Sequence, residues 1–373
     1  MKAEEFKTQY LEKIYKEYSD TRSKSKYLFQ EAQNYLPGGD TRTVTFFRPF
    51  PSFMVRGEGF NLYDVDGNEY IDFFNNATSL VLGHAHPKVV NAVLEQVKCG
   101  SVFASPLACQ TKLAKILCDR LPSADRVRFC NSGTEATLTA IRAARAYRKK
   151  YKIMKMEGGY NGSCDLVEIS VKPDLRKAGS INEPNAVPED DSVSPGTLGE
   201  CVIAPFNEPE IVSRLIEKHH DDLAAVIIEP MQGSCGMIPA DFDFLKVCRD
   251  ITTHFDIPLI FDEVQSFRLS PGGFQEICGV TPDITILGKI IGGGYPVGGV
   301  AGNKKYMDQF SPLNSSFLTH SGTFNGNPVT MVAGIATLSE LQHSEIERIN
   351  SLGANLREEF VRIAKGKSET LVT

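Results

Sequence analysis

Three absences exclude large classes of function for this chain. It has no excess of positive charge, because 40 Lys and Arg stand against 46 Asp and Glu, for a net charge of −6. Nothing in this balance favours nucleic acid as a partner. No apolar run reaches the length of a membrane span, so we expect no membrane partner. The nine cysteines include no Cys-x-x-Cys pair, which indicates core residues rather than zinc ligands or disulfides.

Other candidate signals at the ends and turns are also weak. His84 and His86 in Gly83-His-Ala-His-Pro87 have no third ligand near them in sequence, so a polar turn entering a helix is favoured over a metal site. The opening Met1-Lys2-Ala3-Glu4-Glu5 is too acidic for a signal or transit peptide. We therefore expect no metal and a cytoplasmic location.

The N-terminal part predicts a small unit of helix and hairpin. Residues 4–35 carry apolar side chains at helical spacing and are followed by Pro37-Gly38-Gly39, which predicts one long helix that ends there. Two alternating segments, 60–64 and 69–73, are joined through Asp66-Gly67-Asn68. An Asp-Gly turn between alternating segments predicts an antiparallel hairpin.

From Pro87 onward the pattern becomes helices alternating with short, fully apolar strands at 223–228, 257–261 and 284–287. Strands of this kind are typical of a parallel sheet buried on both faces, so the fold class is α/β. At 373 residues the chain is long enough for one large domain and a smaller companion. We expect an N-terminal helix and antiparallel unit at 1–78, the large α/β domain at 79–328, and the start of a small C-terminal domain at 329–373.

The segment Leu287-Gly-Lys-Ile-Ile-Gly-Gly-Gly294 places Lys289 between an apolar run and three glycines. Such a lysine is either an ordinary strand-to-loop charge or an amine kept among apolar groups for chemistry. In the second case, the apolar setting lowers the preference for the charged form and makes the amine a nucleophile that can form a Schiff base.

Three other segments carry suitable chemistry at the carboxyl ends of predicted strands. Ser132, Gly133 and Thr134 begin a helix after the strand 127–129, where backbone N–H groups could bind phosphate, although a simple Ser/Thr helix cap has the same pattern. Asp262 directly follows an apolar strand, and a carboxylate there could keep a pyridine nitrogen protonated. Tyr160, in Gly158-Gly-Tyr-Asn-Gly162, could stack on a flat ligand.

Phosphate cup, stacking ring, carboxylate and lysine, in this order along an α/β chain, describe a pyridoxal phosphate site. From about residue 35 to 342 the chain resembles class III aminotransferases of fold type I, in the branch that contains glutamate-1-semialdehyde aminomutase and the β-amino-acid transaminases. The resemblance implies pyridoxal 5′-phosphate as cofactor, held covalently by Lys289. It also implies that Asp262 contacts the pyridine nitrogen and that Val264 and Tyr160 pack on opposite ring faces.

By the same resemblance Ser132, Gly133 and Thr134 hold the phosphate. Thr323, in His320-Ser-Gly-Thr-Phe-Asn-Gly-Asn-Pro328, reaches the phosphate of a neighbouring subunit, which implies a homodimer. The fold implied is a large domain with a mostly parallel sheet covered by helices, plus a small α+β domain from the N- and C-terminal segments. The family's last sheet and helices would follow Thr373.

Departures from the family bear on the substrate. Arg42, followed by Arg48-Pro-Phe-Pro51, is similar to β-amino-acid transaminases, where an arginine at this place binds the substrate carboxylate; a salt bridge to Asp40 or Glu58 is the alternative. Ala77 stands where the aminomutase has a tryptophan, and Ser234 where it has an asparagine near the cofactor. The contact that the asparagine makes with the cofactor is therefore not expected at Ser234. The small Ala77 enlarges the pocket and, with Arg42, favours transamination between an amino acid, including β-amino acids, and an oxo acid in a ping-pong Schiff-base mechanism.

Three alternatives remain open at the level of sequence. One is glutamate-1-semialdehyde 2,1-aminomutase, which uses the same residues and retains its intermediate. Another is an aminotransferase module or inactive fragment of a larger protein. A nicotinamide dehydrogenase is disfavoured, because glycines 292–299 do not form a Gly-x-Gly-x-x-Gly turn between a strand and a helix.

Overall fold

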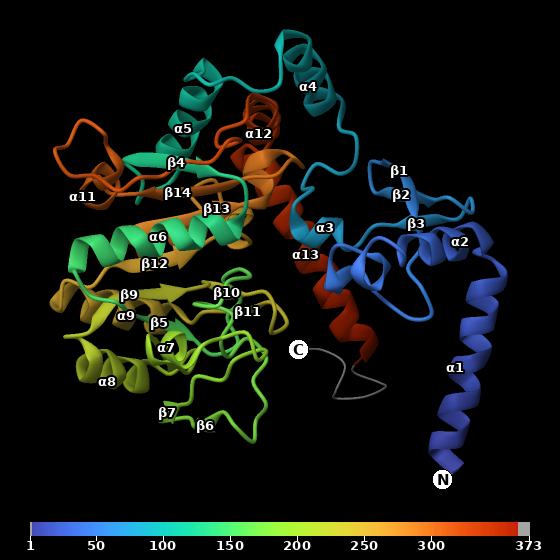
Figure 1. Ribbon diagram of the computed structural model, residues 1–373, viewed down its shortest axis with the longest axis horizontal. Coiled ribbons are helices and arrows are strands. Elements are labelled where there is room, and N and C mark those ends of the chain that lie inside the picture. Colours follow the sequence, from blue (N-terminus) through green and yellow to red (C-terminus); the bar gives the residue numbers. More distant parts are fainter. Residues whose placement is uncertain (1, 365–373) are drawn as a thin grey trace. The chain divides into compact units, whose positions relative to one another are not determined.

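The computed structural model describes residues 2–364 and divides the chain into two units, Met1–Pro87 and Lys88–Thr373. Each unit has its own secondary structure, coloured along the chain in Figure 1. Within residues 2–364, no helix is long and apolar enough to cross a membrane.

The first unit combines helices with a three-stranded antiparallel sheet in the order β1-β2-β3. The hairpin predicted at Asp66-Gly67-Asn68 is confirmed, with Asn61 opposite Ile71. Its elements are α1 (Lys2–Asp20), α2 (Ser23–Ala32), the 3-10 turns Pro37–Gly39 and Thr43–Thr45, β1 (Met54–Glu58), β2 (Asn61–Asp64), β3 (Glu69–Ile71) and α3 (Asn75–Thr78).

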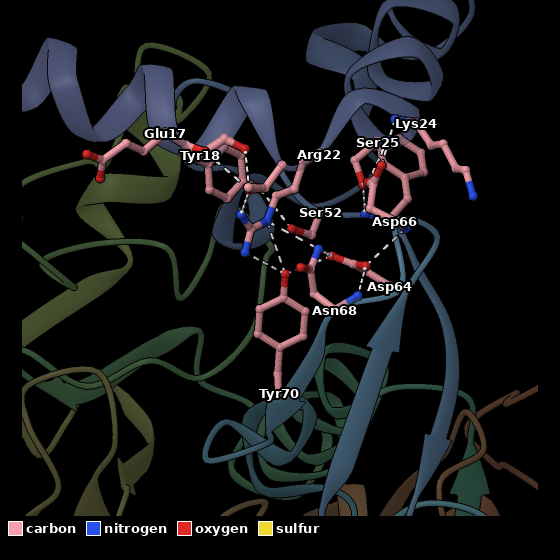
Figure 2. Close-up of polar contacts among 12 residues, drawn as sticks. Glu17, Tyr18, Arg22, Lys24, Ser25, Ser52, Asp64, Asp66, Asn68 and Tyr70 are labelled. Atoms are coloured by element: carbon pink, nitrogen blue, oxygen red, sulfur yellow. Dashed lines mark hydrogen bonds and ion pairs between the residues drawn. The ribbon is translucent and has the colours of Figure 1, made fainter.

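The single helix expected over residues 4–35 is wrong, because α1 ends at Asp20 and α2 begins at Ser23. The break is held by the hairpin turn, as Figure 2 shows. Asp66 accepts hydrogen bonds from the backbone N–H groups of Lys24 (2.7 Å) and Ser25 (3.0 Å) and from the Ser25 hydroxyl (2.6 Å). A carboxylate at this place satisfies free donors of the first turn of α2 and complements the helix dipole.

Asp64 of the same hairpin is buried and accepts hydrogen bonds from Asn68 and from the hydroxyl of Tyr70 (2.7 Å). The guanidinium of Arg22, which lies in the break between the helices, donates to the same hydroxyl (2.8 Å) (Figure 2). The two helices are therefore separated by tertiary hydrogen bonds, which the sequence pattern of residues 4–35 does not predict.

The second unit contains a seven-stranded sheet in the order β4-β14-β13-β12-β9-β5-β8. Only β14 runs antiparallel to its neighbours, so the expected mostly parallel sheet is confirmed. Its strands are β4 (Arg126–Cys130), β5 (Lys152–Met156), β8 (Cys201–Ala204), β9 (Leu223–Ile228), β12 (Leu259–Asp262), β13 (Ile284–Gly288) and β14 (Gly298–Gly302). Two short ribbons are formed by β6 (Gly179–Ser180) with β7 (Glu183–Pro184) and by β10 (Met231–Gln232) with β11 (Ile238–Pro239).

Helices cover both faces of this sheet, as expected for strands that are apolar throughout (Figure 1). One face packs Val226, Ile228 and Phe261 against α8 and α9, and the other packs Ile227 and Ile260 against the alanines of α6. The helices are α4 (Pro87–Cys99), α5 (Ala108–Arg120), α6 (Gly133–Arg148), α7 (Pro195–Gly199), α8 (Pro209–His219), α9 (Phe242–His254), α10 (Phe274–Cys278), α11 (Lys304–Met307), α12 (Pro328–Glu340) and α13 (His343–Ala364).

Candidate active site

Three ionisable side chains follow three adjacent parallel strands of the large sheet. Glu229 comes directly after β9, Asp262 is the last residue of β12, and Lys289 comes directly after β13. These strands are neighbours in the order β13-β12-β9. The carboxyl ends of parallel strands meet at one edge of a sheet, where ligands of α/β proteins bind. The sequence pointed to Asp262 and Lys289 at this edge but did not single out Glu229.

Lys289 is half-buried and has a φ of 48°. A non-glycine residue in this left-handed region carries about 1–3 kcal/mol of strain, which recurs at functional sites. Burial lowers the pKa of the Lys289 amine, and the carboxyls of Asp262 and Glu229 oppose that shift. The amine therefore loses its proton more readily than a surface lysine, and chemistry at a nucleophilic nitrogen becomes accessible.

Asp262 is only 5% exposed and makes two hydrogen bonds. It accepts from the side-chain amide of Asn161 (3.0 Å) and from the backbone N–H of Val264 (3.1 Å). Burial raises the pKa of this carboxyl, while both hydrogen bonds and the Lys289 charge favour its anion. A buried carboxylate in this setting is suited to pair with a cationic ring nitrogen.

Glu229 is the residue that the sequence interpretation missed. It is also 5% exposed, and its Oε2 accepts the backbone N–H of Tyr160 (2.7 Å). Burial, reinforced by the neighbouring charge of Asp262, raises the pKa of Glu229 to about 8. The signal was available, because Glu229 follows the fully apolar strand 223–228 just as Asp262 follows the strand of β12.

The start of α6 is closed by the helix cap that was the alternative to an anion cup, and phosphate binding there stays a prediction. Ser132 is the N-cap, and its side chain accepts the backbone N–H of Glu135 (3.1 Å). The hydroxyl of Thr134 accepts the backbone N–H of Ser163 (3.1 Å). The backbone N–H groups of Gly133 and Thr134 lie in the first turn, at the positive end of the helix.

Val264 lies between this helix start and the residue before Lys289. A β-carbon on Gly133 would lie 3.3 Å from one methyl group of Val264, and a β-carbon on Gly288 would lie 3.3 Å from the other. The absence of both side chains lets Val264 approach the two segments closely. The structure thus brings together the predicted residues Gly133, Val264 and Lys289.

The loop after β5 carries Tyr160 and is held from several sides. The hydroxyl of Tyr160 shares a hydrogen bond with the hydroxyl of Ser163 (3.0 Å), and Tyr160 is 38% exposed. The fully buried amine of Lys155 donates to the carbonyls of Gly159 (2.8 Å) and Ile169 (2.6 Å). At Gly162 φ is 111°, and a β-carbon there would lie 2.8 Å from Cα of Thr134, so the loop touches the start of α6.

These groups fit pyridoxal 5′-phosphate. The N–H groups at the start of α6 could bind its phosphate, the buried carboxyl of Asp262 its ring nitrogen, and the amine of Lys289 its aldehyde carbon. Val264 and Tyr160 offer an apolar and an aromatic surface for a flat ring. Within the described residues, no group of three or more His, Cys, Asp and Glu side chains is arranged to hold a metal ion.

Thr323 is exposed in the loop before α12. Two residues later, the side-chain oxygen of Asn325 accepts a hydrogen bond from Asn131 (2.8 Å), which directly precedes Ser132. This loop therefore lies beside the start of α6, with Thr323 on the surface.

Arg42 belongs to the first unit and is exposed. Its guanidinium donates to the side-chain oxygen of Asn76 (2.8 Å). The alternative ion pairs do not form: Asp40 accepts from the backbone N–H groups of Thr41 and Arg42, and Glu58 pairs with Arg56 (2.7 Å).

The partner of Arg42 lies in a left-handed turn. All four residues of α3 (Asn75–Thr78) have φ between 47° and 69°, and none is glycine. Asp72 holds the turn by accepting the backbone N–H groups of Phe74 (3.0 Å) and Asn75 (2.8 Å), and it also contacts His84 (2.7 Å). Four consecutive strained residues, with Ala77 among them, mark a segment whose backbone shape matters.

Comparisons with known proteins agree with this geometry. The family model "Aminotransferase class-III" matches residues 47–371. A glutamate-1-semialdehyde 2,1-aminomutase 2 of Brevibacillus brevis is 42% identical over 92% of this chain and 79% of its own length. A glutamate-1-semialdehyde 2,1-aminomutase of Methanocaldococcus jannaschii is 44% identical over 85% of this chain and 73% of its own.

Among solved structures, an omega-transaminase from Sphaerobacter thermophilus superposes with a TM-score of 0.89 and 44% identity, over 92% of this chain and 78% of that one. A β-phenylalanine aminotransferase from Variovorax paradoxus gives a TM-score of 0.86 and 34% identity, over 96% of this chain and 79% of that one. The chain therefore belongs to the class III aminotransferases, enzymes of fold type I that depend on pyridoxal 5′-phosphate.

Proposed function

We propose that this enzyme transfers an amino group from a carboxylate-bearing amino acid, including β-amino acids, to an oxo acid. The observation that carries the chemistry is the placement of Asp262 and Lys289 at the ends of adjacent parallel strands, on the edge where α6 begins. Pyridoxal 5′-phosphate, when bound, supplies the electron-accepting ring and the aldehyde carbon that exchanges the amino group.

The residues of the chain supply proton transfer and orientation. Asp262 would pair through its buried carboxylate with the ring nitrogen of the cofactor and favour its protonated form. Lys289 would hold the cofactor at its aldehyde carbon, and its amine, with its pKa lowered by burial, would carry a proton to and from the substrate carbon. Val264 and Tyr160 fix the plane of the ring, and Ser132, Gly133 and Thr134 fix its phosphate.

Arg42 is the proposed group for the substrate carboxylate. Its guanidinium is exposed and donates to a neutral amide oxygen of Asn76 rather than to a carboxylate, so its hydrogen-bonding groups remain available to a substrate. A planar guanidinium binds a carboxylate in bidentate fashion. The β-phenylalanine aminotransferase that this chain resembles acts on a substrate of the proposed class.

The second candidate is glutamate-1-semialdehyde 2,1-aminomutase, the reaction of the relatives at 42 and 44% identity. The two outcomes share every cofactor-binding residue and differ in whether the intermediate product leaves. Transamination is favoured by Ala77, whose small side chain on the strained turn leaves more space than the tryptophan expected there in an aminomutase.

We expect Lys289→Ala to lose the covalent, borohydride-reducible attachment of the cofactor, because no other described amine follows β13 at this edge. Activity should fall by at least about 10²-fold, the usual contribution of a positioned proton-transfer group. Mass spectrometry of the reduced protein measures the attachment, and Lys304→Ala, which changes an exposed lysine, is the control. Attachment that persists in Lys289→Ala would show that another lysine holds the cofactor.

The reaction itself is tested by a screen that follows the cofactor's absorption with β-amino acids, α-amino acids and glutamate 1-semialdehyde in turn. We expect a β-amino acid to convert the cofactor to its aminated form and an oxo acid to restore it. Conversion of glutamate 1-semialdehyde to 5-aminolevulinate without exchange with any oxo acid would replace transamination by the aminomutase reaction.

Arg42→Ala should raise KM for β-phenylalanine about 10- to 100-fold, because a charge-assisted hydrogen bond contributes about 1.5–3 kcal/mol. The same change should leave KM for 1-phenylethylamine, which lacks the carboxylate, nearly unaltered. Arg56→Ala is the matched control, since that arginine already pairs with Glu58. An equal loss with both substrates would assign Arg42 a structural role instead.

We also propose a homodimer in which Thr323 contacts the cofactor phosphate of the partner subunit, because it is exposed on a loop beside the start of α6. Sedimentation of the cofactor-loaded protein should give about twice the chain mass of 41.1 kDa. A monomer that binds the cofactor tightly contradicts the shared site.

A further inference from the structure

Glu229 and Asp262 are side by side at the edge of the sheet. β9 and β12 run parallel with Ile227 opposite Ile260 and Ile228 opposite Phe261. The next positions in this register are Glu229 and Asp262, so their side chains leave the same face of two neighbouring strands, whose backbones lie about 5 Å apart. Each residue is only 5% exposed. Two carboxylates this close and this poorly solvated cannot both remain ionised without a large free-energy cost.

The nearby charges and hydrogen bonds stabilise the anion of Asp262 more than the anion of Glu229. Because the strand order is β13-β12-β9, Asp262 lies between Lys289 and Glu229 and is nearer to that amine. Asp262 also accepts a side-chain amide hydrogen from Asn161, which favours its ionised form. The other ionisable groups that interact with Glu229 are Lys155 of β5 and Cys235 between β10 and β11, and the backbone N–H of Gly233 also donates to its carboxyl and favours the anion. The amine of Lys155 already donates to two backbone carbonyls and is itself destabilised as a cation by burial.

Both acids also hold the loop after β5. Glu229 accepts a hydrogen bond from the backbone N–H of Tyr160 (2.7 Å), and Asp262 accepts one from the side-chain amide of the next residue, Asn161 (3.0 Å). Two successive residues of one loop therefore bridge two neighbouring carboxyls. A protonated carboxyl still has an oxygen that accepts an N–H, so Glu229 can anchor Tyr160 without carrying a charge.

Resting on the proposed cofactor roles of Asp262 and Lys289, we propose that Glu229 is a positioning residue that holds the single proton of this carboxyl pair. Asp262 then carries the pair's negative charge toward the ring nitrogen, and neutral Glu229 anchors the backbone of Tyr160. The proton on Glu229 takes no part in the reaction. It stays there while a different proton moves between Lys289 and the substrate.

The direct test is infrared spectroscopy of the full chain, with and without pyridoxal phosphate, in which the glutamate carboxyls are labelled with 13C. We expect a carbonyl band of a protonated carboxylic acid that shifts with this label, is lost in Glu229→Gln and disappears on titration with a midpoint near pH 8. Glu157→Gln, which changes another poorly solvated glutamate with a raised pKa, is the matched control and should keep the band. If Glu229→Gln leaves the acid bands unchanged across pH 6–9, Glu229 does not hold a proton and the proposal is overturned.

The pairing is tested with Asp262→Asn. Because the charge of Asp262 raises the pKa of Glu229, its removal should lower the midpoint of the Glu229 band. An unmoved midpoint would show that burial alone protonates Glu229 and would overturn the shared-proton pair.

A pH-dependent stability difference gives a second readout in case the band is obscured. Burial raises the pKa of Glu229 from its ordinary value of 4.5 to about 8 in the folded chain, so the folded state binds a proton that the unfolded state has released. The contribution of Glu229 to wild-type stability therefore falls as pH rises from about 4.5 to about 8, and Glu229→Gln lacks this loss. The difference in Tm between Glu229→Gln and wild type should grow in favour of the variant across this range. A constant difference would contradict a neutral Glu229.

The affinity for the cofactor shows whether Glu229 acts as a neutral hydrogen-bond acceptor for Tyr160 or must carry a charge. Glu229→Gln retains the shape and an acceptor for Tyr160, so the Kd for pyridoxal phosphate should stay within about threefold of wild type, while Glu229→Ala should weaken binding about tenfold. Equal losses in both variants would mean that a charged Glu229 is needed. These readouts do not depend on turnover, so their failure would leave the covalent role of Lys289 intact.

Discussion

The candidate site depends on keeping ionisable groups where water is scarce. Asp262 and Glu229 are almost fully buried and Lys289 is half-buried, all three at the ends of adjacent strands. Burial weakens the charged form of each group, and mutual attraction restores part of it. The result is an amine that releases its proton easily and an acid that is stabilised by a positive partner. Both properties are what chemistry on a pyridine aldehyde requires of a protein.

Glycines and left-handed residues in the surrounding backbone make this arrangement possible. Gly133 and Gly288 leave room for Val264, and Gly162 lets the loop of Tyr160 reach the start of α6. Lys289 has left-handed backbone geometry, as does the whole turn Asn75–Thr78 in the other unit. Such strained segments persist because hydrogen bonds hold them, as Asp72 does for that turn. The backbone shape of that turn is therefore maintained by polar contacts.

The sequence predicted those features that depend on the residues of one short segment. The strand 223–228 has the expected bounds, since a continuous apolar run is a local signal. Other features need contacts distant in sequence. The break at Arg22 depends on Asp66 and Tyr70, and the proximity of Glu229 to Asp262 becomes visible only when β9 is known to lie beside β12. Strand order is a property of the folded sheet, so the sequence could not show that the two acids are neighbours.

The central claim is that a buried carboxylate at the end of β12 controls the charge of the cofactor ring. It is tested most directly by 15N NMR of the full chain loaded with pyridoxal phosphate labelled at the ring nitrogen. The account predicts a protonated ring nitrogen at neutral pH in the wild type and an unprotonated one in Asp262→Asn. A ring nitrogen that is unprotonated in the wild type, or equally protonated in both proteins, would contradict it.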